Sequence, residues 1–224
     1  MTEFRKEIEA IVQKNHVLQH PFYVGWNEGK LTQECLRTYA EQYFQHVKVF
    51  PRYISTMHSK TESIEVRQML LENLIDEEKG SENHPELWLR FGEALGATRQ
   101  QIENAKAIPE IQNLIDTFFH LAGSSTAEGL GALFSYESQI PEVAETKIRG
   151  LKTFYGIKEA AGLQFFEVHR TADHYHREQV LQILESLSSE ERSKALVAAE
   201  TASRKIWDFL TGICRETGME TMAA

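Results

Sequence analysis

Three side chains that can bind a metal ion follow one another at helical spacing late in the chain: His169, Asp173 and His176. On an α-helix of about 3.6 residues per turn, the offsets i, i+4 and i+7 fall on one face, so two imidazoles and a carboxylate point the same way. Two histidines and one carboxylate form the ligand set of open-sided ferrous oxygenase sites, and the same mixture suits manganese and zinc. The segment predicts half of a metal site, and the alternative is an ordinary solvated helix face.

Two more side chains of ligand type stand at a break in the middle of the chain. Glu77 ends a strongly helical segment, and His84 follows after Gly80 and directly before Pro85. The residue before a proline is pushed out of helical geometry, so we expect a helix to end here and Pro85 to start the next one. Such a kink could aim His84 at the site. The alternative for Glu77 is a solvated acid in the run D-E-E-K.

Glu137 closes a stretch that is otherwise apolar, with Phe134 and Tyr136 just before it. A carboxylate in such surroundings needs a partner if it is buried, and a metal ion would be one. Gly129 and Gly131 in the same stretch predict close packing against another helix or a ligand.

Aromatic residues gather near the start of the chain. Phe22, Tyr23 and Trp26 form a connector too apolar for a free loop, so we expect Tyr23 to be buried or to line a cavity. The next helix carries a stripe at i, i+4, i+7 and i+11, made of Tyr39, Tyr43, His46 and Phe50. This mixed stripe fits a pocket wall as well as it fits a core in which tyrosine and histidine hydrogen-bond each other.

The composition limits the class of partner. The chain has 33 Asp and Glu against 24 Lys and Arg, and a formal net charge of -9. This acidic balance disfavours nucleic acid and anionic membranes, so we expect a small-molecule or protein partner. Two cysteines, Cys35 and Cys214, are too few for a disulfide framework, which favours a cytoplasmic setting. We find neither a signal peptide nor a segment apolar enough to cross a membrane.

Helical periodicity recurs along the whole chain, and no alternating strand pattern or hairpin turn interrupts it. The fold class predicted is all-α, with about seven or eight helices. The longest runs from about Lys158 to Leu187 and carries the His-Asp-His trio. Thr32 is a predicted N-cap, and Thr98 and Ser188 each begin a predicted capping box.

Five motifs are spread along the chain: H-P-F-Y at 20–23, D-E-E-K-G at 76–80 with N-H at 83–84, L-F-S-Y-E-S-Q-I-P at 133–141, K-I-R-G-L at 147–151 and H-x-x-x-D-x-x-H at 169–176. Together they resemble the family of the chlamydial protein associating with death domains. The resemblance implies one haem-oxygenase-like helical domain over residues 1–224, without haem and with a frayed tail at 216–224. More distantly, the chain is similar to pyrroloquinoline-quinone synthase C and the thiaminase II group.

The resemblance also implies a centre of two iron ions, with manganese as an alternative. Its six ligands would be Glu77, His84, Glu137, His169, Asp173 and His176. Three histidines and three carboxylates give each metal three ligands and leave open positions for oxygen. Molecular oxygen and an external reductant are the co-substrates expected, and a homodimer is the expected assembly.

The activity implied is synthesis of 4-aminobenzoate, the aromatic part of folate, from the protein's own side chains. Tyr23 would become the ring and Lys147 would give the amino nitrogen. Tyr43 and Tyr136 are further catalytic candidates, for radical relay or for orienting a ligand. The ordinary alternatives are that both tyrosines belong to the core and that Lys147 lies on the surface.

Other functions stay open at this point. A related oxygenase or oxidase could act on a diffusible small molecule, and a non-enzymatic protein-binding module is a third reading. A thiaminase needs a cysteine nucleophile in the pocket, and neither Cys35 nor Cys214 stands in a motif that supports one. Two departures from the family are Pro85 beside His84 and a C-terminus, T-G-M-E-T-M-A-A, without a cysteine-rich tail.

Overall fold

Prolines mark where five of the helices begin. The computed structural model describes the backbone of residues 1–219 and the side chains of residues 1–170 and 177–219. Each of the five prolines lies in the first turn of a helix, namely Pro21, Pro51, Pro85, Pro109 and Pro141. A proline fits there because the first N–H groups of a helix have no partner within it.

Within residues 1–219 there are twelve α-helices, one short 3-10 helix and no strand, which confirms the all-α prediction. The expected number of helices is too low, because prolines start new helices where the apolar pattern runs on. The elements are α1 Glu3–Lys14, η1 Val17–Gln19, α2 Pro21–Asn27, α3 Gln33–Val47, α4 Phe50–Lys60, α5 Ile64–Glu78, α6 His84–Ala94, α7 Arg99–Asn104, α8 Pro109–Ser124, α9 Thr126–Glu137, α10 Ile140–Thr153, α11 Ala160–Ser186 and α12 Ser189–Glu216.

The predicted caps are confirmed. The Thr32 side chain accepts a hydrogen bond from Cys35 N at the start of α3. Thr98 with Gln101 and Ser188 with Glu191 form complete capping boxes at α7 and α12. These polar groups satisfy N–H donors that the helices themselves leave unpaired.

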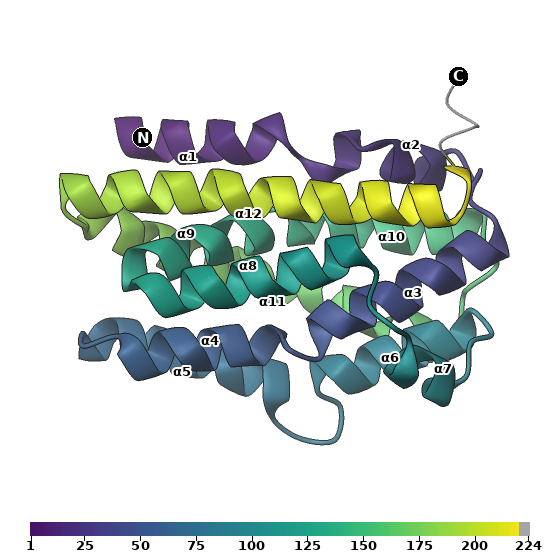
Figure 1. The fold of residues 1–224 in the computed structure, drawn as a ribbon. Helices are drawn as coiled ribbons and strands as arrows, with labels where there is room; N and C mark the ends of the chain where they lie inside the picture. The colour runs from purple at the N-terminus through teal and green to yellow at the C-terminus, as the bar shows by residue number, and fades with distance from the viewer. Residues whose placement is uncertain (220–224) are drawn as a thin grey trace.

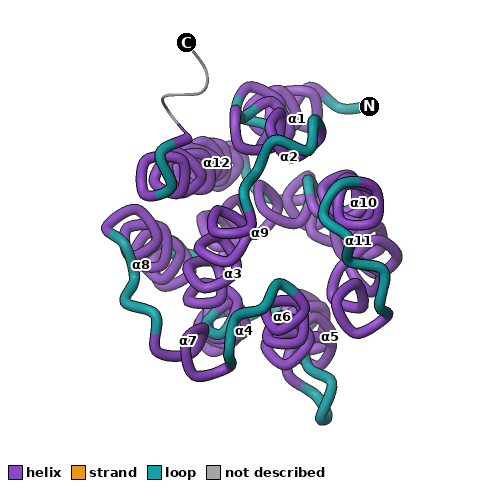
Figure 2. Tube along the Cα trace, turned by 90° about the vertical axis from the view of Figure 1, so that its right-hand side faces the viewer, coloured by secondary structure: helices purple, strands orange, loops and turns teal. Residues whose placement is uncertain are grey.

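The helix α9 lies in the interior of the bundle. It packs against α12, α8 and α11, and the end view places it between them (Figure 2). The long α12 runs beside α1, while α4 and α5 lie side by side on the opposite side of the molecule (Figure 1). All residues from Gly129 to Glu137 are buried, which is the pattern of a helix covered on every side.

Two glycines allow α9 this central position, as the sequence predicts. A Cβ at Gly131 would collide with the backbone carbonyl of Ala195 on α12, and one at Gly129 would collide with the Met57 side chain on α4. Both contacts are closer than any residue with a side chain permits.

The aromatic connector is itself helical: it forms α2. Its Phe22, Tyr23 and Trp26 are buried as expected, with Tyr23 only 3% exposed. Buried apolar side chains of the described residues form one cluster, as a single domain requires. The one-domain division and the homodimer stay predictions, and residues 220–224 of the expected tail lie outside the described chain.

No helix in residues 1–219 combines the length and the apolar character that a membrane span needs. Cys35 and Cys214 are both buried, and no disulfide joins them.

Candidate metal centre and tyrosine–lysine cavity

Three predicted ligands come together at the meeting point of α5, α6 and α11. Glu77 lies in the last turn of α5, His84 is the first residue of α6, and His169 lies on α11. One ligand atom from each lies within 4.8 Å of the other two, and all three residues are buried. The solvated alternative for Glu77 is therefore wrong: the residue is 8% exposed.

The break between α5 and α6 aims His84 at Glu77. The chain leaves α5 after Glu78, and Gly80 takes a positive φ of 86°, which favours glycine. The Asn83 side chain then caps α6 by accepting a hydrogen bond from Glu86 N. Pro85 sits in the first turn and leaves His84 in place, so this departure from the family does not displace the ligand.

The two facing ligand atoms are close enough to interact as an ion pair. Nδ1 of His84 lies 2.8 Å from Oε2 of Glu77, yet this nitrogen has no partner of hydrogen-bond geometry among the described residues. Burial disfavours the imidazolium of His84, but the Glu77 carboxylate outweighs burial and raises the pKa of His84. An imidazole nitrogen and a carboxylate oxygen this close, buried together, fit two ligands of one cation.

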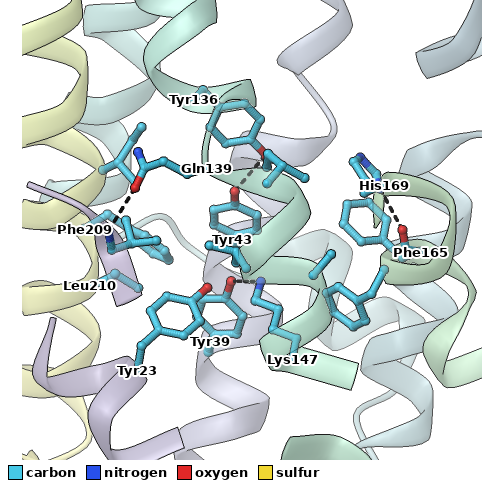
Figure 3. A pocket seen from close by; sticks show the side chains of 16 residues that line it. Tyr23, Tyr39, Tyr43, Tyr136, Gln139, Lys147, Phe165, His169, Phe209 and Leu210 are labelled. Carbon is cyan, nitrogen blue, oxygen red and sulfur yellow. Dashed lines mark hydrogen bonds between the residues drawn. The ribbon is translucent and has the colours of Figure 1, made fainter. Parts of the chain in front are cut away.

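A hydrogen bond behind the site fixes the orientation of His169. Its Nδ1 lies 2.6 Å from the carbonyl oxygen of Phe165, one turn earlier on α11 (Figure 3). Because a carbonyl only accepts, Nδ1 carries the proton and Nε2 is presented as the ligand atom. Metal-binding histidines are commonly held in this way.

Glu137 reaches the same region from α9, outside the cluster of three but near enough for its charge to interact with that of Glu77. Its Oε1 accepts a hydrogen bond of 2.6 Å from Nδ2 of Asn73, while Oε2 is buried without a hydrogen-bond partner among the described residues. Burial raises the pKa of Glu137 to about 8; the Asn73 hydrogen bond opposes the rise and Glu77 adds to it. A buried carboxylate with one unpaired oxygen fits a metal ligand.

These residues fit an iron centre on their own chemistry. The donors are imidazole nitrogens and carboxylate oxygens, and at least one donor atom, Glu137 Oε2, has no other partner among the described side chains. The remaining predicted ligands, Asp173 and His176, lie outside the residues whose side chains are described, so their part stays a prediction.

A second group of predicted residues meets beside α3. Tyr23 on α2 and Lys147 on α10 are 3% and 4% exposed, so the surface alternative for Lys147 is wrong. The Lys147 Nζ donates a 2.5 Å hydrogen bond to the Tyr39 hydroxyl, and the Tyr23 hydroxyl lies beside that of Tyr39 (Figure 3).

Aromatic rings surround the Lys147 amine. Its Nζ lies 5.8 Å from the centre of the Tyr23 ring and 4.8 Å from that of Tyr39, with Trp88 and Phe166 also near. Burial lowers the pKa of Lys147 to about 7, and no carboxylate among the described side chains offsets this shift. Buried lysines are known to lose their charge for this reason.

Tyr43 and Tyr136 are joined by a hydrogen bond of 2.8 Å between their hydroxyls. The ring of Tyr43 is stacked on that of Tyr39, with centroids 5.5 Å apart. Burial raises the pKa of Tyr43, and the charge of Glu77 raises it further. Tyr43 therefore lies near both the tyrosine–lysine group and the predicted ligand Glu77. Of the predicted aromatic stripe, Tyr39 and Tyr43 line the cavity, whereas His46 and Phe50 pack in the core.

One small cavity joins the two groups. It has about 40 Å³ of free space, with Tyr23, Tyr43 and Lys147 in its wall and His169 at another side (Figure 3). A water molecule needs on the order of 10–15 Å³, so the cavity has room for a few molecules of that size. Neither Cys35 nor Cys214 is part of its lining.

Sequence reasoning missed Asn73 and Trp88, and it placed Tyr39 only in a stripe. Trp88 is fully buried, donates from Nε1 to the Ala40 carbonyl oxygen, and packs its ring against Tyr39 and Tyr43. The signal that could have revealed Asn73 is an amide on the buried face of α5, one turn before Glu77.

Comparisons with known proteins find relatives by sequence and a shared fold. A family model described as iron-containing redox enzyme matches residues 37–207. A 4-aminobenzoate synthase of Nitrosomonas europaea is 43% identical over 94% of this chain and 90% of its own, and one of Chlamydia muridarum is 39% identical over 92% and 88%. A solved domain of unknown function from Shewanella denitrificans, with a heme oxygenase-like fold, superposes with a TM-score of 0.81 at 14% identity, over 98% of this chain and 94% of that one.

Proposed function

We propose that this chain, which belongs to the family of iron-containing redox enzymes and is a relative of 4-aminobenzoate synthases, makes 4-aminobenzoate in an oxygen-dependent reaction. Tyr23 would supply the aromatic ring and Lys147 the amino nitrogen. One observation carries the self-substrate part of the proposal: these two buried side chains meet through the Tyr39 hydroxyl, in a cavity that also reaches His169.

Two iron ions would be held by Glu77, His84, Glu137, His169, Asp173 and His176. The described members of this set offer the nitrogen and oxygen donors that iron takes, and the same donors bind manganese. With dioxygen and an external reductant, the metal pair would supply the oxidising power that attack on a phenol ring requires. The chain's own part is to hold the phenol close and to keep bulk water out.

Lys147 is suited to give its nitrogen. Forming a carbon–nitrogen bond requires a lone pair on the amine, which the ammonium form lacks. Because burial brings the pKa of Lys147 to about 7, about half of these amines are neutral at pH 7. An exposed lysine would be almost wholly charged at that pH.

Tyr23 enters the reaction as a protonated phenol. Burial raises the pKa of its hydroxyl, so a phenolate does not form at neutral pH. Oxidation of the ring then has to move that proton. The Tyr39 hydroxyl lies next to both Tyr23 and the Lys147 amine, so when that amine is neutral and accepts the hydrogen bond from Tyr39, the hydroxyl can pass the proton from Tyr23 to it.

The cavity disfavours the alternative of a diffusible organic substrate. Ligand pockets for drug-sized molecules measure roughly 300–1,000 Å³, far more than the space left between Tyr23 and His169. A molecule of the size of dioxygen fits that space. A thiaminase reaction would need a cysteine nucleophile, and neither Cys35 nor Cys214 lines the cavity. No observation on the described surface favours a protein-binding function.

The decisive experiment supplies purified protein with ferrous iron, oxygen and a reductant, and no organic substrate. We expect 4-aminobenzoate to appear at no more than one molecule per chain, with a matching loss of protein mass. Protein made with ring-labelled tyrosine should release labelled product. Unlabelled product, or product formed only when an aromatic compound is added, would refute the self-substrate reaction.

Substitution of single side chains then separates the roles. Tyr23→Phe should bind iron normally and yield no product, because the phenol is the ring source. Tyr155→Phe is the matched control, since Tyr155 is a half-buried tyrosine that hydrogen-bonds the Trp26 carbonyl outside the cavity wall. It should keep full yield.

A further inference from the structure

Asn73 is a buried amide that touches a predicted ligand and that no part of the proposed reaction uses. It lies on α5 and is 3% exposed. Its Nδ2 donates a hydrogen bond of 2.6 Å to Oε1 of Glu137. The two residues are 64 positions apart, so tertiary packing alone makes this contact.

The consequence for Glu137 follows from its two oxygens. Oε1 is occupied by the amide, and Oε2 is buried with no hydrogen-bond partner among the described side chains. The carboxylate cannot rotate to exchange these oxygens without breaking the contact with Asn73. It therefore offers one particular oxygen to the site.

Asn73 shares one face of α5 with the predicted ligand Glu77. Asn73 and Glu77 are one turn apart on α5, at i and i+4, so both project from the same face. One helix thus supplies a ligand directly and orients a second ligand that comes from α9. Any shift of α5 would move both carboxylates together.

We propose that Asn73 is a positioning residue of the metal centre: its amide holds Oε1 of Glu137, so that Glu137 binds metal through Oε2 alone, as a terminal ligand. The inference rests on the metal centre proposed above for Glu77, His84, Glu137 and His169. An amide serves where a lysine would not, because it orients the carboxylate without adding a positive charge that would compete with the cation.

The test compares Asn73→Leu with Gln45→Leu. Gln45 is a matched control because it is a buried amide, 5% exposed, that donates to the backbone oxygens of Glu41 and Ile102 away from the site. Iron affinity is measured by competition with a chelator, and Co²⁺ is used as a spectroscopic probe of coordination. Circular dichroism and urea unfolding report the fold of each variant.

We expect Asn73→Leu to bind iron about 10–100-fold more weakly than the unaltered protein, which is the usual effect of removing a hydrogen bond behind a ligand. Its Co²⁺ absorption bands should change, whereas those of Gln45→Leu should match the unaltered protein. Asn73→Ala places no branched side chain against Glu137, and its iron affinity and Co²⁺ bands should change in the same direction as those of Asn73→Leu. This second variant provides the test if Asn73→Leu does not fold.

Two results would overturn the positioning role. One is iron affinity and a Co²⁺ spectrum in both Asn73 variants equal to those of the unaltered protein. The other is an equal loss of iron in Gln45→Leu, since that would make lost stability the cause. If the unaltered protein itself binds no iron, the proposed metal centre fails, and that failure is visible before any variant is made.

Discussion

Replacing Lys147 by methionine should make the protein more stable, and more so at pH 7 than at pH 9. Burial lowers the pKa of this lysine from 10.5 to about 7 in the folded chain. Between pH 7 and pH 10.5 the unfolded chain therefore binds more protons than the folded chain, so the free energy of unfolding rises with pH across this window. Methionine has similar length and no charge, so its variant lacks this dependence.

The magnitude follows from the two pKa values. Keeping Lys147 buried destabilises the fold by about 4 kcal/mol at pH 7 and by about 2 kcal/mol at pH 9. The variant also loses the hydrogen bond to the Tyr39 hydroxyl, which contributes about 1 kcal/mol. The net gain expected for Lys147→Met is thus about 3 kcal/mol at pH 7 and about 1 kcal/mol at pH 9.

Urea unfolding of metal-free protein at the two pH values measures this gain. Lys152→Met is the control, because Lys152 lies on the same helix with a side chain 47% exposed. The free energy of unfolding of Lys152→Met should differ from that of the unaltered protein by the same small amount at both pH values. A gain for Lys147→Met that does not shrink between pH 7 and pH 9 would refute the argument that burial neutralises this amine.

Three further predictions follow from single contacts. Glu137→Gln should lose iron, measured by metal analysis, while the metal-free variant should be about 3 kcal/mol more stable than the unaltered protein in urea unfolding at pH 7, because burial raises the carboxyl pKa from 4.5 to about 8 and folding at pH 7 must therefore protonate a group that is ionised in the unfolded chain. Gly131→Ala should destabilise the protein by about 1–3 kcal/mol in urea unfolding, because its Cβ meets the α12 backbone; Gly123→Ala, which meets only a lysine tip, should not. Tyr43→Phe should lower stability by about 1 kcal/mol through loss of the 2.8 Å contact with Tyr136, and should slow 4-aminobenzoate release in a single-turnover assay while iron content stays constant.

The sequence by itself determined the helical class, the caps and the types of ligand. These features depend on short spacings: periodicity predicts helices, Thr98 and Ser188 are capping signals, and Glu77 and His84 stand at a break that Gly80 produces. The burial of Tyr23 could also be predicted, because three aromatic side chains in seven residues are rarely left in water.

Only the tertiary structure decided which of these residues meet. Nothing local distinguishes Asn73 from any other amide or Tyr39 from a core tyrosine, and Lys147 had an equally good reading as a surface residue. Their roles come from contacts with Glu137 and with each other across 64 and 108 positions of the chain. Such contacts arise from the way α5, α3 and α10 pack around the buried helix α9, and the burial that packing produces is what shifts the pKa of Lys147 and of Glu137.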